Sequence, residues 1–328
     1  MKSREICLGI EGTAHTFGVG IMDGKANVLA NEQSMYMPKE GGIHPREAAN
    51  HHTEVAGLVI QSAMRKAGLN KEDISLIAFS QGPGLGPCLR TAATAARTLS
   101  LSLDVPIIGV NHCIAHLEIG RAVCKCQDPV LLYVSGGNTQ VISYANGRYR
   151  VFGETMDIGL GNMLDKFGRD MGMPFPAGPG IEKLAAQGRN LLPLPYSVKG
   201  MDVSFSGILT AAQQMKNTPL EDVCHSIQET CFAMLTEVTE RAMAHLGKSE
   251  VLLGGGVVRN RRLVLMLETM CAERNAKCFV PPPALCSDNG AMIAWTGLIM
   301  NRSGIKMTLN ETGVLQKFRT DEVDVTWL

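Results

Sequence analysis

The sequence predicts an α/β fold built from two duplicated lobes. Residues 6–24 read as an apolar strand, a polar turn and a second strand, and residues 129–149 repeat that plan. The two hairpins lie about 120 residues apart, a separation that suits a duplicated domain better than a solenoid. Strands alternate with helical patterns after each hairpin, as in α/β sheets.

The elements that follow each hairpin support the duplication. Residues 45–69 open with Pro45, keep a helical period and end at Gly68, so they predict a helix. The other segments of the first half are a strand at 74–84, a helix at 89–103, and a strand followed by a helix at 106–123. In the second half they are helices at 157–171, 179–187 and 219–247, a strand, glycine turn and helix at 249–274, a strand at 276–282 and a last helix at 286–304.

Two repeats of this kind, each led by a hairpin with a polar turn, describe the architecture of actin, sugar kinases and Hsp70. We therefore expect an actin-like ATPase (ASKHA) fold with a cleft between its lobes. The expected division is a first lobe at 1–127, a second at 128–290, and a C-terminal helix and tail at 291–328 that packs back on the first lobe. A chain of 328 residues is long enough for both cores.

Composition excludes several classes of protein. The chain is 45% hydrophobic and 19% charged, without the run of about 18 apolar residues that a membrane span requires. Its start lacks a cleavage site for secretion, so we expect a cytoplasmic protein whose ten cysteines are reduced. Cys124 and Cys126 form a CxC pair, but structural zinc needs four ligands. The formal net charge of zero argues against binding nucleic acid through overall charge alone.

Two glycine-rich turns indicate nucleotide binding. Ser135 to Thr139 forms the turn of the second hairpin, where backbone N–H groups and a hydroxyl could hold phosphates. Gly254 to Gly256 follows a strand and precedes a helix, as in loops that pack against a nucleoside. The alternative for the first turn is an ordinary hairpin turn. Three consecutive glycines are rarely needed for folding alone, so the turns together favour a nucleotide site.

His112 and His116 are the strongest candidate metal ligands. Residues at i and i+4 share one helix face, with Cβ atoms roughly 5–6 Å apart. Metalloproteases of the HExxH type carry their general base directly after the first histidine, where this chain has Cys113. A lone HxxxH pair is more often packed or solvated than metal-binding. A third ligand would change that balance, and Asp288, near the start of the last helix, is a candidate from the other lobe. His51 and His52 show no ligand spacing.

Several segments resemble one family closely. The chain is similar, to about Gly304, to the TsaD family and its archaeal and eukaryotic KEOPS subunit. The amino-acid sequences of the segments at 110–116 and 204–207 resemble the archaeal and eukaryotic branch more than the bacterial one. The segments are GGIHPREAANHH (41–52), SQGPGLGPCLR (80–90), VNHCIAH (110–116), YVSGGNTQ (133–140), DIGLGNMLDKFGR (157–169), FPAGPGIEKLA (175–185), KGMDVSFSG (199–207), GGGVVRNRRL (254–263) and PPALCSDNGAMIAW (282–295).

The resemblance implies a set of site residues. His112, His116 and, from the second lobe, Asp288 match the metal ligands of the family, Tyr133 matches a tyrosine beside the metal, and the ion is one iron or zinc per subunit. The implied adenylate-binding residues, for threonylcarbamoyladenylate, ATP or AMP with Mg²⁺ as a candidate counterion, are Tyr133, Val134, Ser135, Gly136, Gly137, Asp165, Gly178, Glu182 and Asn260. Without this resemblance, the sequence would indicate only that Asp165 and Glu182 lie on a solvated helix face.

The reaction that the resemblance implies is acyl transfer to tRNA. An L-threonylcarbamoyl group would pass from its adenylate to N6 of adenosine 37, in tRNAs that read codons beginning with adenine, and AMP would leave. The implied partners are tRNA and the other KEOPS subunits, namely a small atypical kinase/ATPase and two small accessory proteins, with no membrane involved. Two other classes stay open, an actin-fold small-molecule kinase or ATPase and a non-catalytic nucleotide-binding scaffold. The old endopeptidase label of the family is disfavoured by the missing glutamate.

Overall fold

The computed structural model describes residues 5–38 and 42–328, and it divides them into two compact units. Within the described residues, unit 1 comprises 5–38, 42–123, 146–149 and 288–328, and unit 2 comprises 124–145 and 150–287. The segment predicted as a second lobe, 128–290, is therefore shared, since unit 1 includes 146–149 and everything from Asp288 onwards. Gly41, which begins the first family-like segment, lies outside the described residues.

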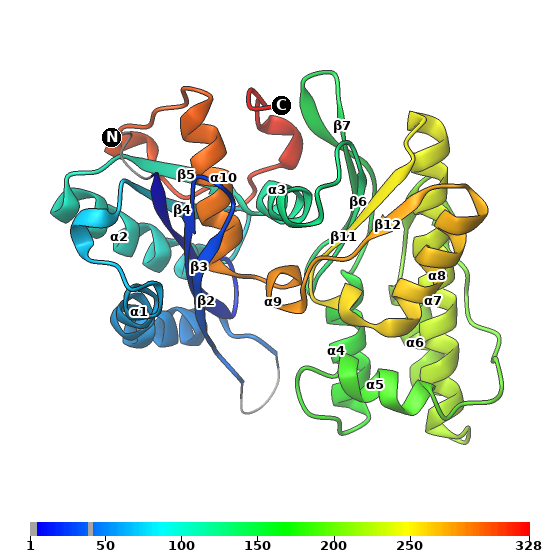
Figure 1. Ribbon diagram of the computed structural model, residues 1–328. Coiled ribbons are helices and arrows are strands. Elements are labelled where there is room, and N and C mark those ends of the chain that lie inside the picture. The colour runs from blue at the N-terminus through cyan, green and yellow to red at the C-terminus, as the bar shows by residue number, and fades with distance from the viewer. Residues whose placement is uncertain (1–4, 39–41) are drawn as a thin grey trace. The chain divides into compact units, whose positions relative to one another are not determined.

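Unit 1 is built on a five-stranded sheet in the order β3-β2-β1-β4-β5 (Figure 1). The leading hairpin pairs β1 with β2 in antiparallel fashion, whereas β4 and β5 run parallel to β1. The strands are β1 (Ile6–Glu11), β2 (Thr16–Asp23), β3 (Val28–Met35), β4 (Leu76–Gly82) and β5 (Ile107–Asn111). The helices are α1 (Pro45–Ala67), α2 (Gly86–Leu103), α3 (His112–Cys124) and α10 (Gly290–Arg302).

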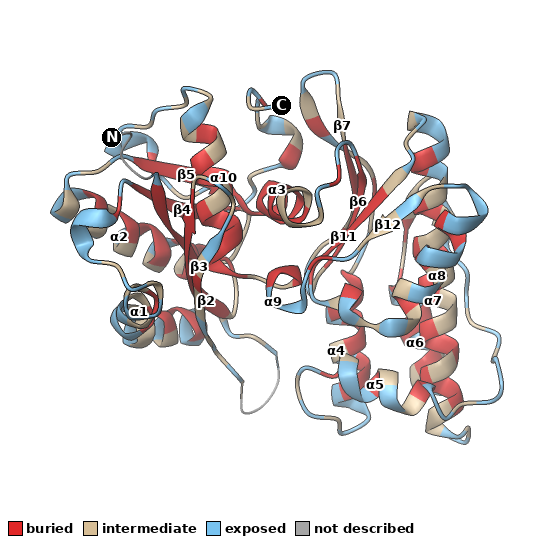
Figure 2. Cartoon of the chain, in the orientation of Figure 1, coloured by how far each residue is buried: buried red, intermediate tan, exposed pale blue. Residues whose placement is uncertain are grey.

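Both faces of this sheet are covered by helices, which is why its central strands are buried throughout (Figure 2). Ile10 and Phe17 pack with alanines of α1 and α2 on one face. Gly9 and Gly20 face α10, and a Cβ on Gly20 would lie 2.0 Å from the backbone nitrogen of Ala291. Alternation along each strand thus separates large residues toward α1 and α2 from glycines toward α10.

Unit 2 repeats the same strand order. Its sheet reads β8-β7-β6-β11-β12, with β6 antiparallel to β7 and parallel to β11, and with β11 parallel to β12. The strands are β6 (Val130–Val134), β7 (Thr139–Ala145), β8 (Arg148–Glu154), β11 (Glu250–Gly254) and β12 (Lys277–Phe279), beside a small hairpin of β9 (Val198–Lys199) and β10 (Asp202–Val203). The helices are α4 (Leu160–Asp170), α5 (Gly178–Ala185), α6 (Ser206–Gln214), α7 (Leu220–Leu246), α8 (Arg261–Glu273) and α9 (Pro283–Cys286). The duplicated fold expected from the hairpins is therefore confirmed.

The last predicted helix, 286–304, is shorter in the structure, where α10 spans Gly290–Arg302 and the short α9 overlaps the predicted range only at Cys286. The short α9 ends at Cys286, and α10 begins at Gly290 after Asn289, whose side chain accepts the N–H of Met292. The N-cap residue of a helix has an extended backbone, so α10 cannot include Asn289 or the residues before it. Asp288 consequently sits in a connection rather than on a helix.

The tail after α10 returns to the elements of unit 1. It contains two short 3₁₀ turns, at Leu309–Glu311 and Thr320–Glu322. The side-chain amide of Gln81 donates to the carbonyls of Glu311 and Gly313, and the N–H of Leu315 donates to the carbonyl of Gln81. The tail is thus bonded along the end of β4. Among the described residues, none of the helices combines the length and apolar character that crossing a bilayer requires.

Candidate metal centre and nucleotide turns

His112 and His116 stand on a helix that starts directly at the end of a parallel strand. Strand β5 ends at Asn111 and α3 begins with the next residue. The side-chain oxygen of Asn111 accepts the N–H groups of Cys113 and Ile114, while its amide donates to the carbonyl of Phe318 in the tail. These bonds fix the first turn of α3 and therefore the place of His112.

Three ligand groups meet at this helix. Nε2 of His112 and Nε2 of His116 each lie 3.4 Å from Oδ1 of Asp288, and one ligand atom from each residue lies within 4.8 Å of the others. Both histidines are almost fully buried, and their rings are nearly perpendicular, with centroids 4.8 Å apart. No other cluster of three His, Cys, Asp or Glu ligands exists within residues 5–38 and 42–328.

The geometry of this cluster fits a metal ion. Two ligand atoms that each lie about 2.1 Å from a tetrahedral ion are about 3.4 Å apart. The histidines lie at that separation from the aspartate oxygen, while the three ligand atoms together lie within 4.8 Å of one another, so binding an ion would draw them closer. The placement of Asp288 differs from the prediction, because it belongs to unit 1 together with the histidines rather than to the second lobe. The reason is that α10 packs against the glycines of β1 and β2.

Charge in the cluster is set by burial and by mutual contact. Burial opposes ionisation of Asp288, but the two imidazoles favour its anion, and the pKa of its carboxyl lies well below the usual value. Burial lowers the pKa of His116, with Asp288 acting in the opposite direction. A neutral imidazole and an ionised carboxylate are the forms that bind metals. Burial also raises the pKa of the Cys113 thiol, which leaves that residue unsuited to act as a base.

Glu11 and Thr13 are part of this site, although the sequence did not single them out. Glu11 ends β1 with its side chain fully buried, and its Oε2 lies 3.0 Å from Nδ1 of His112. Thr13 donates both its N–H and its hydroxyl to Oε1 of Glu11. A carboxylate directly after five apolar strand residues was the available signal, since an unpaired buried charge would be costly.

In unit 2 the predicted phosphate turn is tightly closed on itself and exposed at its tip. The N–H of Ser135 donates to the carbonyl of Asn138, and the N–H of Asn138 donates to the Ser135 hydroxyl. Gly136 and Gly137 are exposed, and nothing lies within 4 Å of the place where Gly137 would carry a Cβ. Tyr133 and Val134 precede the turn and are buried in β6. The assignment of Tyr133 to the metal stays a prediction.

The triple glycine follows β11 beside the same strand end. Gly255 has a φ of 93°, and a Cβ on it would lie 2.2 Å from the carbonyl oxygen of Val134, so only glycine fits. Around Gly178 and Gly256 there is open space. Backbone of this kind can be approached closely by a ligand.

The three polar residues predicted to hold the nucleoside already have bonds within unit 2. Oδ1 of Asp165 accepts the N–H of Ala177, and Oε1 of Glu182 accepts the N–H of Arg261. Asn260 caps α8 through its side-chain oxygen, while its amide donates to Gln228. These bonds orient the side chains.

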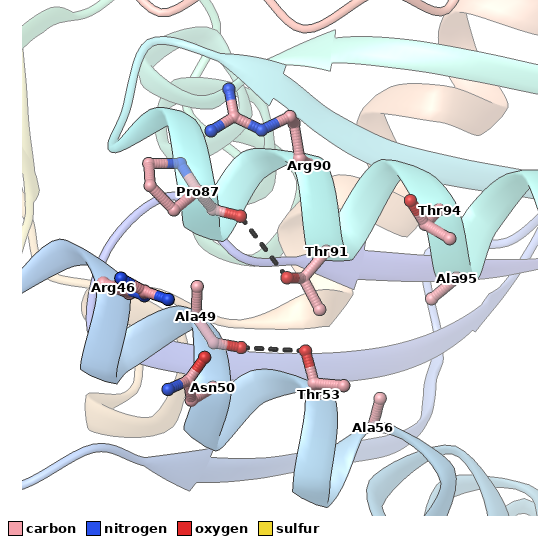
Figure 3. Close-up of a pocket in the computed structure, with 10 residues that line it drawn as sticks. All are labelled: Arg46, Ala49, Asn50, Thr53, Ala56, Pro87, Arg90, Thr91, Thr94 and Ala95. Atoms are coloured by element: carbon pink, nitrogen blue, oxygen red, sulfur yellow. Dashed lines mark hydrogen bonds between the residues drawn. The ribbon is translucent and has the colours of Figure 1, made fainter.

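A separate groove of about 500 Å³ runs between α1 and α2 of unit 1 (Figure 3). It contains none of the predicted site residues. Two of its threonines form hydrogen bonds within their own helices. Thr53 donates to the carbonyl of Ala49, and Thr91 donates to the carbonyl of Pro87. The lining residues are Arg46, Ala49, Asn50, Thr53, Ala56, Pro87, Arg90, Thr91, Thr94 and Ala95.

The duplicated sheets define this chain as a protein of the actin-like ATPase fold, with a candidate metal centre in its first unit. Solved structures of the same fold include HypF from T. kodakarensis (TM-score 0.65, 15% identity, 92% of this chain and 48% of that one). They also include the activator of 2-hydroxyisocaproyl-CoA dehydratase from Clostridium difficile (TM-score 0.55, 13% identity, 93% and 99%). At these identities the likeness shows the fold alone.

The chain belongs to the TsaD family, whose model, described as tRNA N6-adenosine threonylcarbamoyltransferase, matches residues 26–295. A protein of that name from Thermococcus sibiricus is 57% identical over 325 residues, which cover 98% of this chain and 100% of the relative. A "probable bifunctional tRNA threonylcarbamoyladenosine biosynthesis protein" from Methanothermobacter thermautotrophicus is 58% identical over 98% of this chain. The chain spans only 61% of that longer relative.

Proposed function

We propose that this chain is a metal-dependent acyltransferase of tRNA. It would transfer the threonylcarbamoyl group of L-threonylcarbamoyladenylate to N6 of adenosine 37, in tRNAs that read codons beginning with adenine, and release AMP. The observation that carries the proposal is the convergence of His112, His116 and Asp288, at metal-ligand separations, in a chain of this family.

The chemistry asks for positioning and charge stabilisation more than for a nucleophile from the protein. The N6 amine attacks the carbamoyl carbon, the bond from that carbon to the phosphate oxygen breaks, AMP leaves with the electron pair, and one amine proton is released. A carbamoyl–phosphate anhydride is already activated, so orientation supplies much of the rate. When bound, a divalent iron or zinc ion supplies a Lewis acid for the donor carbonyl.

The residues of unit 2 would bind the adenylate. The exposed N–H groups around Gly136 and Gly137 would hold the leaving phosphate, with Mg²⁺ as a candidate counterion. The carboxylates of Asp165 and Glu182 would accept the ribose hydroxyls. Gly178 and Gly256 would let the nucleoside lie against backbone, because no side chain projects there.

The proposed assembly is KEOPS, in the cytoplasm, with a small atypical kinase/ATPase and two small accessory proteins. One observation supports a need for partners. The formal net charge of this chain is zero, so overall charge contributes little to binding tRNA.

The test is a transfer assay with purified protein, with and without those partners, using tRNA and threonylcarbamoyladenylate. Nucleoside mass analysis should show modified adenosine, and the double variant His112→Ala/His116→Ala should reduce it to background. The matched control His44→Ala/His245→Ala removes two exposed histidines and should keep full activity. A small-molecule kinase of the same fold would keep its phosphorylation in the first variant. The absence of product in every combination would leave the scaffold as the better account.

A further inference from the structure

Glu11 is a buried carboxylate in direct contact with the candidate metal centre. It is 0% exposed, at the end of β1, on an element different from those that carry the three ligand groups. Each of its oxygens has a close polar contact. Oε1 accepts the N–H of Thr13 at 2.7 Å and its hydroxyl at 2.5 Å, and Oε2 lies 3.0 Å from Nδ1 of His112.

The two ring nitrogens of His112 therefore face carboxylates at different distances. Nδ1 lies 3.0 Å from Glu11, an ordinary hydrogen-bond length, whereas Nε2 lies 3.4 Å from Asp288. The shorter contact favours a ring proton on Nδ1, because the acceptor there lies at an ordinary hydrogen-bond distance, whereas the contact of Nε2 with Asp288 is longer. Nε2 then keeps its lone pair in the direction of Asp288 and His116. A histidine can bind a metal only through such a lone pair.

We propose that Glu11 is the positioning residue of the metal centre, that it favours the Nδ1–H form of His112 so that Nε2 is the atom presented as a ligand beside Asp288, and that Thr13 holds Glu11 in turn. The inference rests on the metal site of the proposed function. Carboxylates that accept the second N–H of a ligating histidine fix its ring and raise its basicity. Glu11 does not reach solvent, so its part is exerted through His112.

The first experiment measures zinc affinity by competition with a chromogenic chelator, using the full chain. Glu11→Gln keeps the size of the side chain and removes its charge, and we expect zinc to bind about 10- to 100-fold more weakly. Thr13→Val removes one donor to Glu11 and should give a smaller loss. The matched control is Asp222→Asn in unit 2, another buried carboxylate, which accepts two backbone N–H groups and one amide. It should bind zinc as the wild-type chain does.

The second experiment determines the tautomer of the His112 ring in the metal-free chain. Long-range ¹⁵N–¹H correlation spectra of the metal-free chain, with His112 assigned by its absence in His112→Ala, should show the Nδ1–H tautomer in the wild type. In Glu11→Gln the Nε2–H tautomer should gain population, because the amide group can donate to Nδ1. A purely structural role for Glu11 would change thermal stability without changing the tautomer.

The outcomes separate this inference from the proposed function. Zinc binding that depends on His112 and His116 but is unchanged in a folded Glu11→Gln variant would overturn the positioning role and leave the metal site intact. A wild-type chain that binds no zinc would remove the metal, and the tautomer spectrum alone would then decide what Glu11 does to His112. If Glu11→Gln fails to fold, the wild-type tautomer and the Thr13→Val affinity decide, and an Nε2–H ring in the wild type overturns the proposal.

Discussion

The indole N–H of Trp327 donates to Oε1 of Glu118 at 2.8 Å, and Glu118 lies on the helix that carries both candidate metal histidines. Glu118 is buried and also accepts from Tyr149 and Arg121. The tail of the chain is therefore bonded to α3 at its middle as well as at its first turn. The family model stops at residue 295, so Trp327 lies beyond the matched segment while Glu118 lies within it.

Replacing Trp327 with Phe should lower the free energy of unfolding by about 1.5–3 kcal/mol. The variant keeps an aromatic ring but removes one donor from a buried carboxylate, and a bond to a charged group is worth about that much. Urea denaturation measures the change. Leu328→Ala, which alters an exposed neighbour, is the control and should stay within about 0.5 kcal/mol of wild type. Equal stability of Trp327→Phe would show that the indole bond contributes nothing.

Asn111 has two roles that substitution can separate. Asn111→Ala removes the cap of α3 and the bond to the tail, and should cost about 1–2 kcal/mol and weaken zinc binding. Asn111→Asp keeps the cap oxygen but loses the amide that donates to Phe318. It should retain most of the zinc affinity while exposing the tail to limited proteolysis. Equal zinc affinities in the two variants would contradict a role for the cap in placing His112.

Glycine substitutions should act in opposite directions at two positions. A Cβ on Gly290 would lie 2.0 Å from the backbone nitrogen of Gly20, so Gly290→Ala should force α10 away from the sheet. We expect a loss of at least about 3 kcal/mol and of tight zinc binding, since Asp288 precedes that helix. Gly57 lies within α1 with open space around it, and Gly57→Ala should add about 0.5–1 kcal/mol. Thermal unfolding of both variants checks the pair.

Stability should fall as the pH drops from 6.5 toward 4, because of His52. Its Nε2 donates to the carbonyl of Ala14, and Nδ1 is buried with no partner among the described atoms. Burial lowers the pKa of His52 to about 4, below the value of about 6.5 in an unfolded chain. The unfolded state therefore binds the extra proton first, and the folded state loses up to roughly 3 kcal/mol across that window.

The variant His52→Gln should flatten this pH dependence while keeping a donor for Ala14. The control is His51→Gln on the same helix, whose histidine contacts the Ser34 hydroxyl and is only half-buried. It should retain the wild-type slope. His116, whose pKa is also lowered by burial, contributes alike to all three proteins. A slope in His52→Gln as steep as that of wild type would contradict the assignment.

Local patterns predicted most of the elements, and contacts distant in sequence determined the rest. The hairpins, the long helix that became α7 and the pairing of His112 with His116 depend on periods of two and 3.6 residues, which the sequence displays. The predicted helix at 157–171 begins only at Leu160, because the carboxylate of Asp157 accepts the N–H groups of Ile158 and Phe205 instead. Glu11 could not be assigned, since its partner His112 is 101 residues away.

The tail was the least predictable part, for the same reason. Residues 305–328 have no strong period, and their bonds go to single polar groups such as Gln81 and Asn111 rather than to an apolar face. The unit to which Asp288 belongs could not be predicted from the local pattern either. The pattern around it reads as one helix, and only the close packing of Gly290 on Gly20 places it with the histidines.

The separation of 172 residues between His116 and Asp288 also has a consequence for how the protein is made. At about 5–20 residues per second, a ribosome adds Asp288 roughly 9 to 34 s after His116. Every residue of unit 2 has been synthesised before that aspartate appears. During this interval the two histidines lack the third group of the proposed metal centre, so a site with all three ligands can form only after the nascent chain has passed residue 288.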